Sequence, residues 1–153
     1  MPSRRDLIRM SAEEVDAFLA GRHSMSVATV GPGGAIHLVA MWYGFLDGAP
    51  AFWTYARSQK VRNLERDPRC TCLVEAGQAY GDLRGVELVG RGEVLADRAA
   101  VLAVGRSVWE RYTGPWDDAA AAAVAAVGAK RVAVRLDVER VVSWDHTKLG
   151  GTY

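Results

Sequence analysis

Five basic residues fall within thirteen consecutive positions in the middle of the chain, directly after an aromatic segment. They are Arg57, Lys60, Arg62, Arg66 and Arg69, and two acidic residues between them leave a local charge of +3. The whole chain has a net charge of only +1, so this concentration is local. Such a cluster attracts phosphate when it stands at the start of a helix, because the first N–H groups of a helix have no partner and carry partial positive charge.

The sequence predicts that start. Residues 59–66 read as a short helix in which Val61 and Leu64 face the core, and Ser58 is a suitable N-cap. Lys60 would then lie in the first turn, where a cation opposes the helix dipole unless an anion is bound nearby. At Ser58 and Lys60 the pattern fits a phosphate site and a solvated surface helix equally well. For the three later arginines of the cluster we prefer the solvated helix.

Four aromatic residues lie on two predicted strands that Asp47 and Gly48 would join as a hairpin. They are Trp42, Tyr43, Trp53 and Tyr55. In that hairpin Trp42 and Trp53 stand nearly opposite each other, and their rings could form a slab for a flat heteroaromatic molecule. Each of the four, taken singly, fits a core or a dimer interface better.

Other reactive residue types give no recognisable site. Cys70 and Cys72 share one face of a predicted strand and lack the paired spacing of a zinc site, so we interpret them as buried thiols. A hydroxyl, a carboxylate and an imidazole meet in residues 143–148, but without the strand–turn–helix motif of a serine hydrolase. His23 and His37 are isolated. We expect no metal site.

The composition is that of a single globular domain, residues 1–153. Half of the residues are hydrophobic, and 19 basic residues against 18 acidic ones argue against a nucleic-acid partner. No segment approaches eighteen uncharged apolar residues, and residues 1–10 contain no apolar stretch of a signal peptide. These features predict a cytoplasmic protein without membrane association.

Periodicity predicts an α+β fold. A capping box at Ser11 and Glu14 begins a first helix, and residues 97–128 read as two helices broken near Gly114. Alternating or apolar segments predict strands over residues 25–30, 35–46, 51–55, 70–75, 86–95, 130–137 and 141–144. Short hairpin links favour an antiparallel sheet that curls into a barrel with helices at its ends.

Several of these segments resemble the pyridoxamine 5'-phosphate oxidase-like split-barrel proteins, which bind flavin or deazaflavin. The resemblance rests on WT at 53–54, SQK at 58–60, RNL at 62–64 and DPR at 67–69, and continues through 83–86, 90–92 and 143–151. It covers residues 24–151. The later motifs are most similar to the branch described as dependent on coenzyme F420.

The resemblance implies a homodimer of six-stranded split β-barrels with two cofactor sites at the subunit interface. It assigns the cofactor phosphate to Ser58, Gln59 and Lys60. It assigns the ring system to Val39, Ala40, Met41, Trp42, Trp53 and Thr54.

Gln59 departs from the family pattern, because FMN-dependent oxidases usually have arginine there. Losing that charge weakens a bidentate phosphate contact, so we rank F420 above FMN. Arg57, Lys60 and Arg62 could follow the longer tail of F420. The implied activity is hydride transfer between F420 and a small conjugated organic substrate, and the cavity for that substrate could include Tyr80, Tyr112, Trp116 and His146. The alternatives are an FMN-binding relative and a non-catalytic flavin or deazaflavin carrier.

Overall fold

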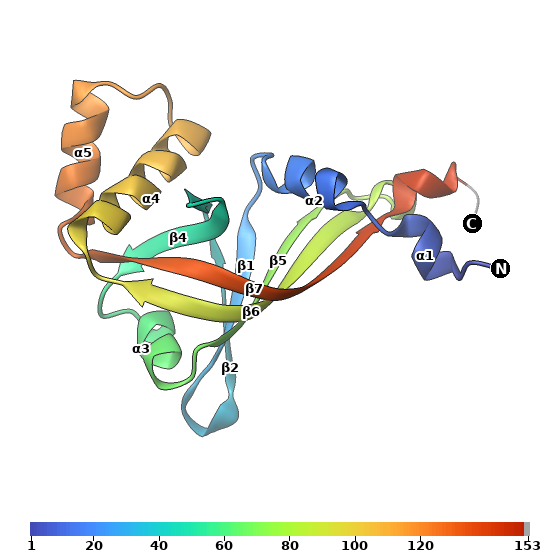
Figure 1. Ribbon diagram of the computed structural model, residues 1–153, viewed down its shortest axis with the longest axis horizontal. Coiled ribbons are helices and arrows are strands. Elements are labelled where there is room, and N and C mark those ends of the chain that lie inside the picture. The colour runs from blue at the N-terminus through green and yellow to red at the C-terminus, as the bar shows by residue number, and fades with distance from the viewer. Residues whose placement is uncertain (152–153) are drawn as a thin grey trace.

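The computed structural model describes residues 1–151, and these form one curled antiparallel sheet of seven strands with helices at both ends (Figure 1). The strand order is β2-β1-β5-β6-β7-β4-β3. The strands are β1 (Met25–Val30), β2 (Ile36–Met41), β3 (Gly44–Leu46), β4 (Ala49–Tyr55), β5 (Arg69–Ala76), β6 (Arg84–Leu95) and β7 (Arg131–Asp145). The predicted α+β class and antiparallel sheet are confirmed.

Four of the five α-helices in residues 1–151 begin at a residue whose side chain caps the helix. The five helices are α1 (Arg4–Ile8), α2 (Ala12–Leu19), α3 (Gln59–Arg66), α4 (Arg98–Tyr112) and α5 (Asp118–Gly128), with single 3-10 turns η1 (Pro32–Gly34), η2 (Tyr80–Asp82) and η3 (His146–Leu149). Ser11 and Glu14 form the predicted capping box of α2. Asp97 and Asp117 accept a bond from a backbone N–H in the first turn of α4 and α5. No helix within residues 1–151 combines the length and the apolarity needed to cross a membrane.

Two predictions about the strands are wrong. Residues 35–46 do not form one strand: the chain leaves the ladder at Trp42 and Tyr43, so that β2 and β3 lie at opposite edges of the sheet. Tyr43 is fully buried there, and its hydroxyl donates to the Leu19 carbonyl at the end of α2. This break gives seven strands where the split-barrel resemblance implied six.

The two final strands predicted from the sequence are one strand, β7, with a bulge. Val89 pairs with Arg140 and the next residue, Gly90, pairs with Val138, which leaves Glu139 as the extra residue. A bulge keeps a strand in its ladder while it bends. The polar interruption at residues 137–140 therefore marks an irregularity inside a strand and not its end.

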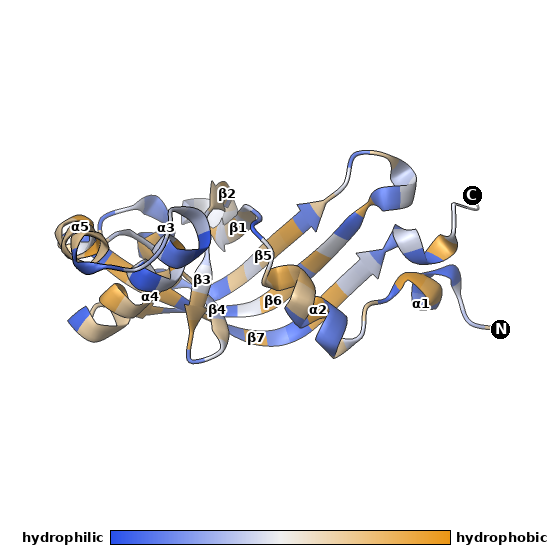
Figure 2. Cartoon of the chain, turned by 90° about the horizontal axis from the view of Figure 1, so that it is seen from above, coloured by the Kyte–Doolittle hydropathy of each residue, from blue (hydrophilic) through white to orange (hydrophobic). Residues whose placement is uncertain are grey.

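Apolar side chains lie on both faces of β4. Phe52 belongs to the main core inside the curled sheet, whereas Ala51 and Trp53 face a second apolar cluster formed with α4. Figure 2 shows hydrophobic and hydrophilic residues interspersed along β6, and the mostly hydrophobic residues of α5. The helical pair α4–α5 thus adds a second apolar layer at one end of the sheet.

Candidate functional site

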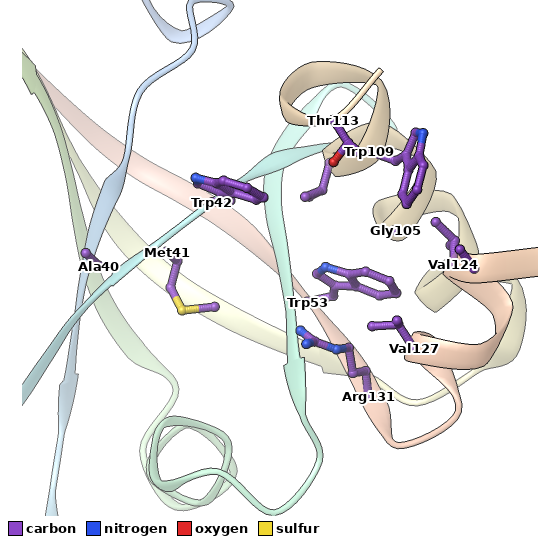
Figure 3. A pocket seen from close by; sticks show the side chains of 12 residues that line it. Ala40, Met41, Trp42, Trp53, Gly105, Trp109, Thr113, Val124, Val127 and Arg131 are labelled. Carbon is purple, nitrogen blue, oxygen red and sulfur yellow. The ribbon is translucent and has the colours of Figure 1, made fainter. Parts of the chain in front are cut away.

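A pocket of about 360 Å³ lies where the end of β2, strand β4 and the α4–α5 pair meet. Figure 3 shows the rings of Trp42, Trp53 and Trp109 around it, with Val124 and Val127 of α5 on the far side. Arg131, the first residue of β7, supplies the one charged side chain of the lining. The pocket is within the size range of small-molecule sites and is apolar with few polar groups, as such sites are.

Trp53 is held in place by two glycines. A Cβ atom at Gly105 of α4 would lie 2.7 Å from the Trp53 ring, and one at Gly128 of α5 would lie 3.2 Å from it. Only residues without a side chain allow both helices to approach the ring this closely. On the other side the Arg131 guanidinium lies over the ring, 4.8 Å from its centroid. The orientation of Trp53 is therefore fixed by its surroundings.

The side of the pocket that contains Trp42 does not form the aromatic slab expected from the sequence. Trp42 does not stack on Trp53; its ring lies parallel to that of Tyr112, with centroids 4.8 Å apart and an interplanar angle of 2°. Trp42 remains half exposed, at 54% of its possible surface, because it lies in the break between β2 and β3. A flat ring with one free face is available for stacking in this position.

Arg111, which no sequence pattern indicated, fixes the position of Trp42 and Tyr112. Its guanidinium donates to the carbonyls of Tyr43, Leu19, Ala20 and Gly21. It thereby ties the end of α4 both to the β2–β3 break and to the end of α2. This arrangement satisfies backbone acceptors that the ends of these elements leave free.

Strand β4 has a free edge beside the pocket. Its ladder with β3 ends at the pair Gly44 and Ala51, whereas its ladder with β7 continues to Tyr55 and Arg131. Residues 52–55 therefore have a strand on one side only, and some of their backbone N–H and C=O groups face away from the sheet. Such groups can bond the edge of a ring system.

The first turn of α3 contains a buried ammonium group. Lys60 is 9% exposed, and its Nζ donates to Thr54 Oγ1 at 3.0 Å. Burial lowers the pKa of Lys60, and the nearby Arg131 guanidinium lowers it further. Within residues 1–151 no carboxylate lies within 4.0 Å of this ammonium. A buried cation without a counter-ion is unfavourable, and an anionic ligand would relieve it.

Ser58 stands at the N-cap position of α3, but it does not make the predicted capping bond. Its Oγ is buried without a hydrogen-bond partner in the described part of the chain. The helix is anchored instead by Asn63, which is fully buried, donates to Thr29 of β1 and accepts from Gln59. The free hydroxyl beside the first turn is therefore available to a ligand.

Four cations meet at this end of β4 and β7, and we call them the basic corner. They are Arg57, Lys60, Lys130 and Arg131. The backbone bond from Ala56 N to Lys130 O, 3.0 Å long, brings the two segments together, and Arg57 and Lys130 line a second hollow of about 570 Å³. None of the four forms an ion pair with a carboxylate of residues 1–151.

The residues predicted for the cofactor are distributed over these features. Ala40, Met41, Trp42 and Trp53 line the pocket, while Thr54 and Lys60 bond each other beside it. The rest lie elsewhere: Val39 packs against the main core, Gln59 bonds Asn63, and Arg57 and Arg62 are exposed.

The four residues suggested for a substrate cavity do not lie together. Tyr112 contacts Trp42, whereas Trp116 lies under Arg106, and Tyr80 and His146 contact each other. None of the four lines the pocket of the described chain. No sequence pattern indicated that Lys130, Arg131 and the apolar wall of α4 and α5 belong to the site. For the wall, the glycines spaced among apolar residues in 97–128 were the available signal.

The comparisons with known proteins show the family and the fold of this chain. The sequence profile described as pyridoxamine 5'-phosphate oxidase matches residues 11–145. The chain belongs to this family. No curated protein matches the chain. A solved structure of the conserved hypothetical protein Rv2991 from Mycobacterium tuberculosis is 44% identical, with a TM-score of 0.94, and the match covers 99% of this chain and 95% of that one.

The names of two more distant structures of the same fold refer to different molecules. A protein named F420 reductase is 23% identical with a TM-score of 0.64, covering 82% of this chain and 94% of that one. A heme binding protein from Mycobacterium smegmatis is 22% identical with a TM-score of 0.65, and the match covers 92% of this chain and 60% of that one. At this identity they show a shared fold. The family includes oxidoreductases.

Proposed function

We propose that this protein is a cytoplasmic oxidoreductase that binds coenzyme F420 and transfers a hydride between it and a small conjugated organic substrate. The observation that carries the proposal is the junction of an aromatic pocket with the basic corner, whose buried Lys60 has no carboxylate partner in residues 1–151. A flat ring joined to an anionic tail has the shape and the charge that this junction accepts. The name of one structural relative, F420 reductase, supports the same cofactor.

The residues present fit such a cofactor. Trp42 offers a free ring face, and the open edge of β4 at residues 52–55 offers backbone groups for the ring edge. Ser58 offers an unpartnered hydroxyl and Lys60 an ammonium for the phosphate of the tail. Arg57 and Arg62, both exposed, could accompany the rest of the tail.

The bound cofactor would supply the hydride-transfer chemistry, and the chain would supply orientation and exclusion of water. The apolar wall formed by Val108, Val124 and Val127 keeps water away from a ring in the pocket. The fixed positions of Trp53 and of the Trp42–Tyr112 pair restrict how the ring can lie. No acid–base or nucleophilic side chain is required from the protein for this role.

In this proposal the chain forms a homodimer with two cofactor sites at the subunit interface, as the family resemblance implies. Strand β2 is an edge strand, and Ile36 and Leu38 on it are 66% and 67% exposed. Large apolar side chains at a free sheet edge favour association. The expected result is a dimer in sedimentation equilibrium; a monomer at all micromolar concentrations would contradict this part of the proposal.

Parallel titrations test the function. The purified protein is titrated with F420 and with FMN, and the tighter complex is screened for hydride transfer to quinones and enones. We expect tighter binding of F420, because Gln59 does not supply a charge for the compact phosphate of FMN. Tighter binding of FMN would select the flavin alternative. Binding of F420 without turnover of any substrate would select the carrier alternative.

A further inference from the structure

Arg131 carries a positive charge that no hydrogen bond or ion pair of the described chain offsets. It lines the pocket, and its Nε is buried without an acceptor. No hydrogen bond or ion pair joins its guanidinium to another residue in the range 1–151. Arginine stays protonated in proteins, so the charge persists. Burying a charged donor without an acceptor is unfavourable, which indicates that an acceptor is missing.

Two aromatic rings hold the guanidinium in a defined orientation. Arg131 is paired with Tyr55 across the β4–β7 ladder, and its Cζ lies 4.6 Å from the centroid of the Tyr55 ring and 4.8 Å from that of Trp53. Contacts of this kind use the face of the guanidinium. Its N–H groups lie in the plane of the guanidinium and have no acceptor within residues 1–151, so they can bond an acceptor with two oxygens.

The surroundings restrict what that acceptor can be. The rest of the pocket is apolar and aromatic, with Val108, Trp109 and Val124 among its walls. Arg131 lowers the pKa of Lys60, so a second positive charge lies within electrostatic reach. A molecule that fits both the walls and the charges has a flat apolar body and one anionic group.

We propose that Arg131 is the anion anchor of this pocket and that its guanidinium binds an oxyanion, phosphate or carboxylate, of the flat molecule that occupies the pocket. The inference rests on the proposed function only for the identity of that molecule. The oxyanion belongs either to the tail of the cofactor or to a flat organic acid that serves as substrate. The two sources share the same chemistry and can be separated by experiment.

The experiment compares Arg131→Met and Arg131→Lys with the wild-type protein. Arg140→Met serves as the matched control, because it removes an exposed arginine from the same strand. The probes for the cofactor are F420 and the deazaflavin that lacks the phosphate-bearing tail. The probes for an organic acid are 1-naphthoate and its neutral counterpart 1-naphthamide. Binding is measured without turnover, by F420 fluorescence and by quenching of tryptophan fluorescence.

We expect Arg131→Met to weaken binding of at least one anionic probe by roughly ten- to hundredfold, the scale of a lost charged hydrogen bond. The uncharged counterpart of that probe should change by less than threefold. A selective effect on F420 assigns the anchor to the cofactor tail, and a selective effect on naphthoate assigns it to the substrate. Arg131→Lys keeps the charge but lacks the planar set of guanidinium N–H donors, so its affinity for the anionic probe should fall less than that of the methionine variant.

Three results would overturn the anchor: no larger loss than in Arg140→Met, an equal loss for charged and uncharged probes, or no binding of either anion to the wild-type protein. Binding of naphthoate without binding of F420 would remove the proposed function and leave the anchor in place. If Arg131→Met does not fold, as judged by its thermal transition, the comparison of naphthoate with naphthamide in Arg131→Lys decides.

Discussion

Replacing Lys60 with methionine should stabilise the protein without its ligand and weaken its binding of F420. Lys60 is 9% exposed, and its only hydrogen-bond partner in residues 1–151 is Thr54. Methionine keeps most of the length of the side chain and removes the buried charge. Removing a buried cation that lacks a counter-ion gains about 1–3 kcal/mol, and losing the hydrogen bond to Thr54 costs about 1 kcal/mol, so we expect a net gain of about 1 kcal/mol. In a chain of this size that gain raises the melting temperature by about 2–4 °C.

The stability gained by replacing Lys60 with methionine should decrease as the pH rises. Burial and Arg131 lower the pKa of Lys60 in the folded protein, whereas the unfolded chain has a pKa of about 10.4. Between the two values the unfolded state binds more protons, so the stability of the wild-type protein rises with pH. The advantage of the methionine variant is therefore complete below the folded pKa and shrinks as the pH approaches the unfolded value.

Binding should change in the opposite direction. Loss of a charged hydrogen bond to the tail phosphate costs about 1.5–3 kcal/mol, or roughly 10- to 150-fold in the dissociation constant for F420. Urea denaturation between pH 6 and pH 10 measures the stability, and fluorescence titration measures the binding, with Arg140→Met as the control in both. A variant that is less stable at every pH and binds F420 normally would show that Lys60 is structural and that the reasoning is wrong.

Three further substitutions probe the walls of the pocket. Gly105→Ala places a methyl group 2.7 Å from the Trp53 ring, and we expect a loss of about 1–3 kcal/mol in unfolding free energy, measured by urea denaturation, together with altered tryptophan fluorescence. Arg111→Met removes the donors to four backbone carbonyls and should lower the stability by about 2–4 kcal/mol, visible in the same denaturation curves; an unchanged midpoint would contradict its anchoring role. Trp42→Ala removes the half-exposed ring that stacks on Tyr112 and should weaken binding of a flat ligand by about 1 kcal/mol in a titration, with little effect on stability.

Much of the fold was predictable from the sequence because the signals were local. Caps such as Ser11, the two-residue turn at Asp47 and Gly48, and the apolar alternation of β1, β5 and β6 each depend on a few neighbouring residues. The break at Trp42 and Tyr43 was missed for a different reason. Tyr43 leaves the ladder to reach the core and the end of α2, and that contact lies 24 residues away in the chain.

The candidate site was likewise predictable from the sequence only in part. Ser58, Lys60 and the helix after them form one continuous segment, so their types and spacing alone indicated an anion site at the start of α3. The sequence could not indicate that Lys60 is buried, or that Ser58 leaves its hydroxyl unpartnered, because both depend on how α3 packs against β1 and β4.

The sequence by itself determined the antiparallel pattern of the sheet and the cationic segment that follows β4. Only the tertiary structure brought Lys130 and Arg131 to that segment, because the pairing of Tyr55 with Arg131 joins residues that are 76 positions apart. The α4–α5 wall likewise acquires its role only when Gly105 and Gly128 let the two helices approach Trp53. Side-chain spacing along a chain encodes local structure, whereas a pocket is made by the contacts that the folded core imposes between distant segments.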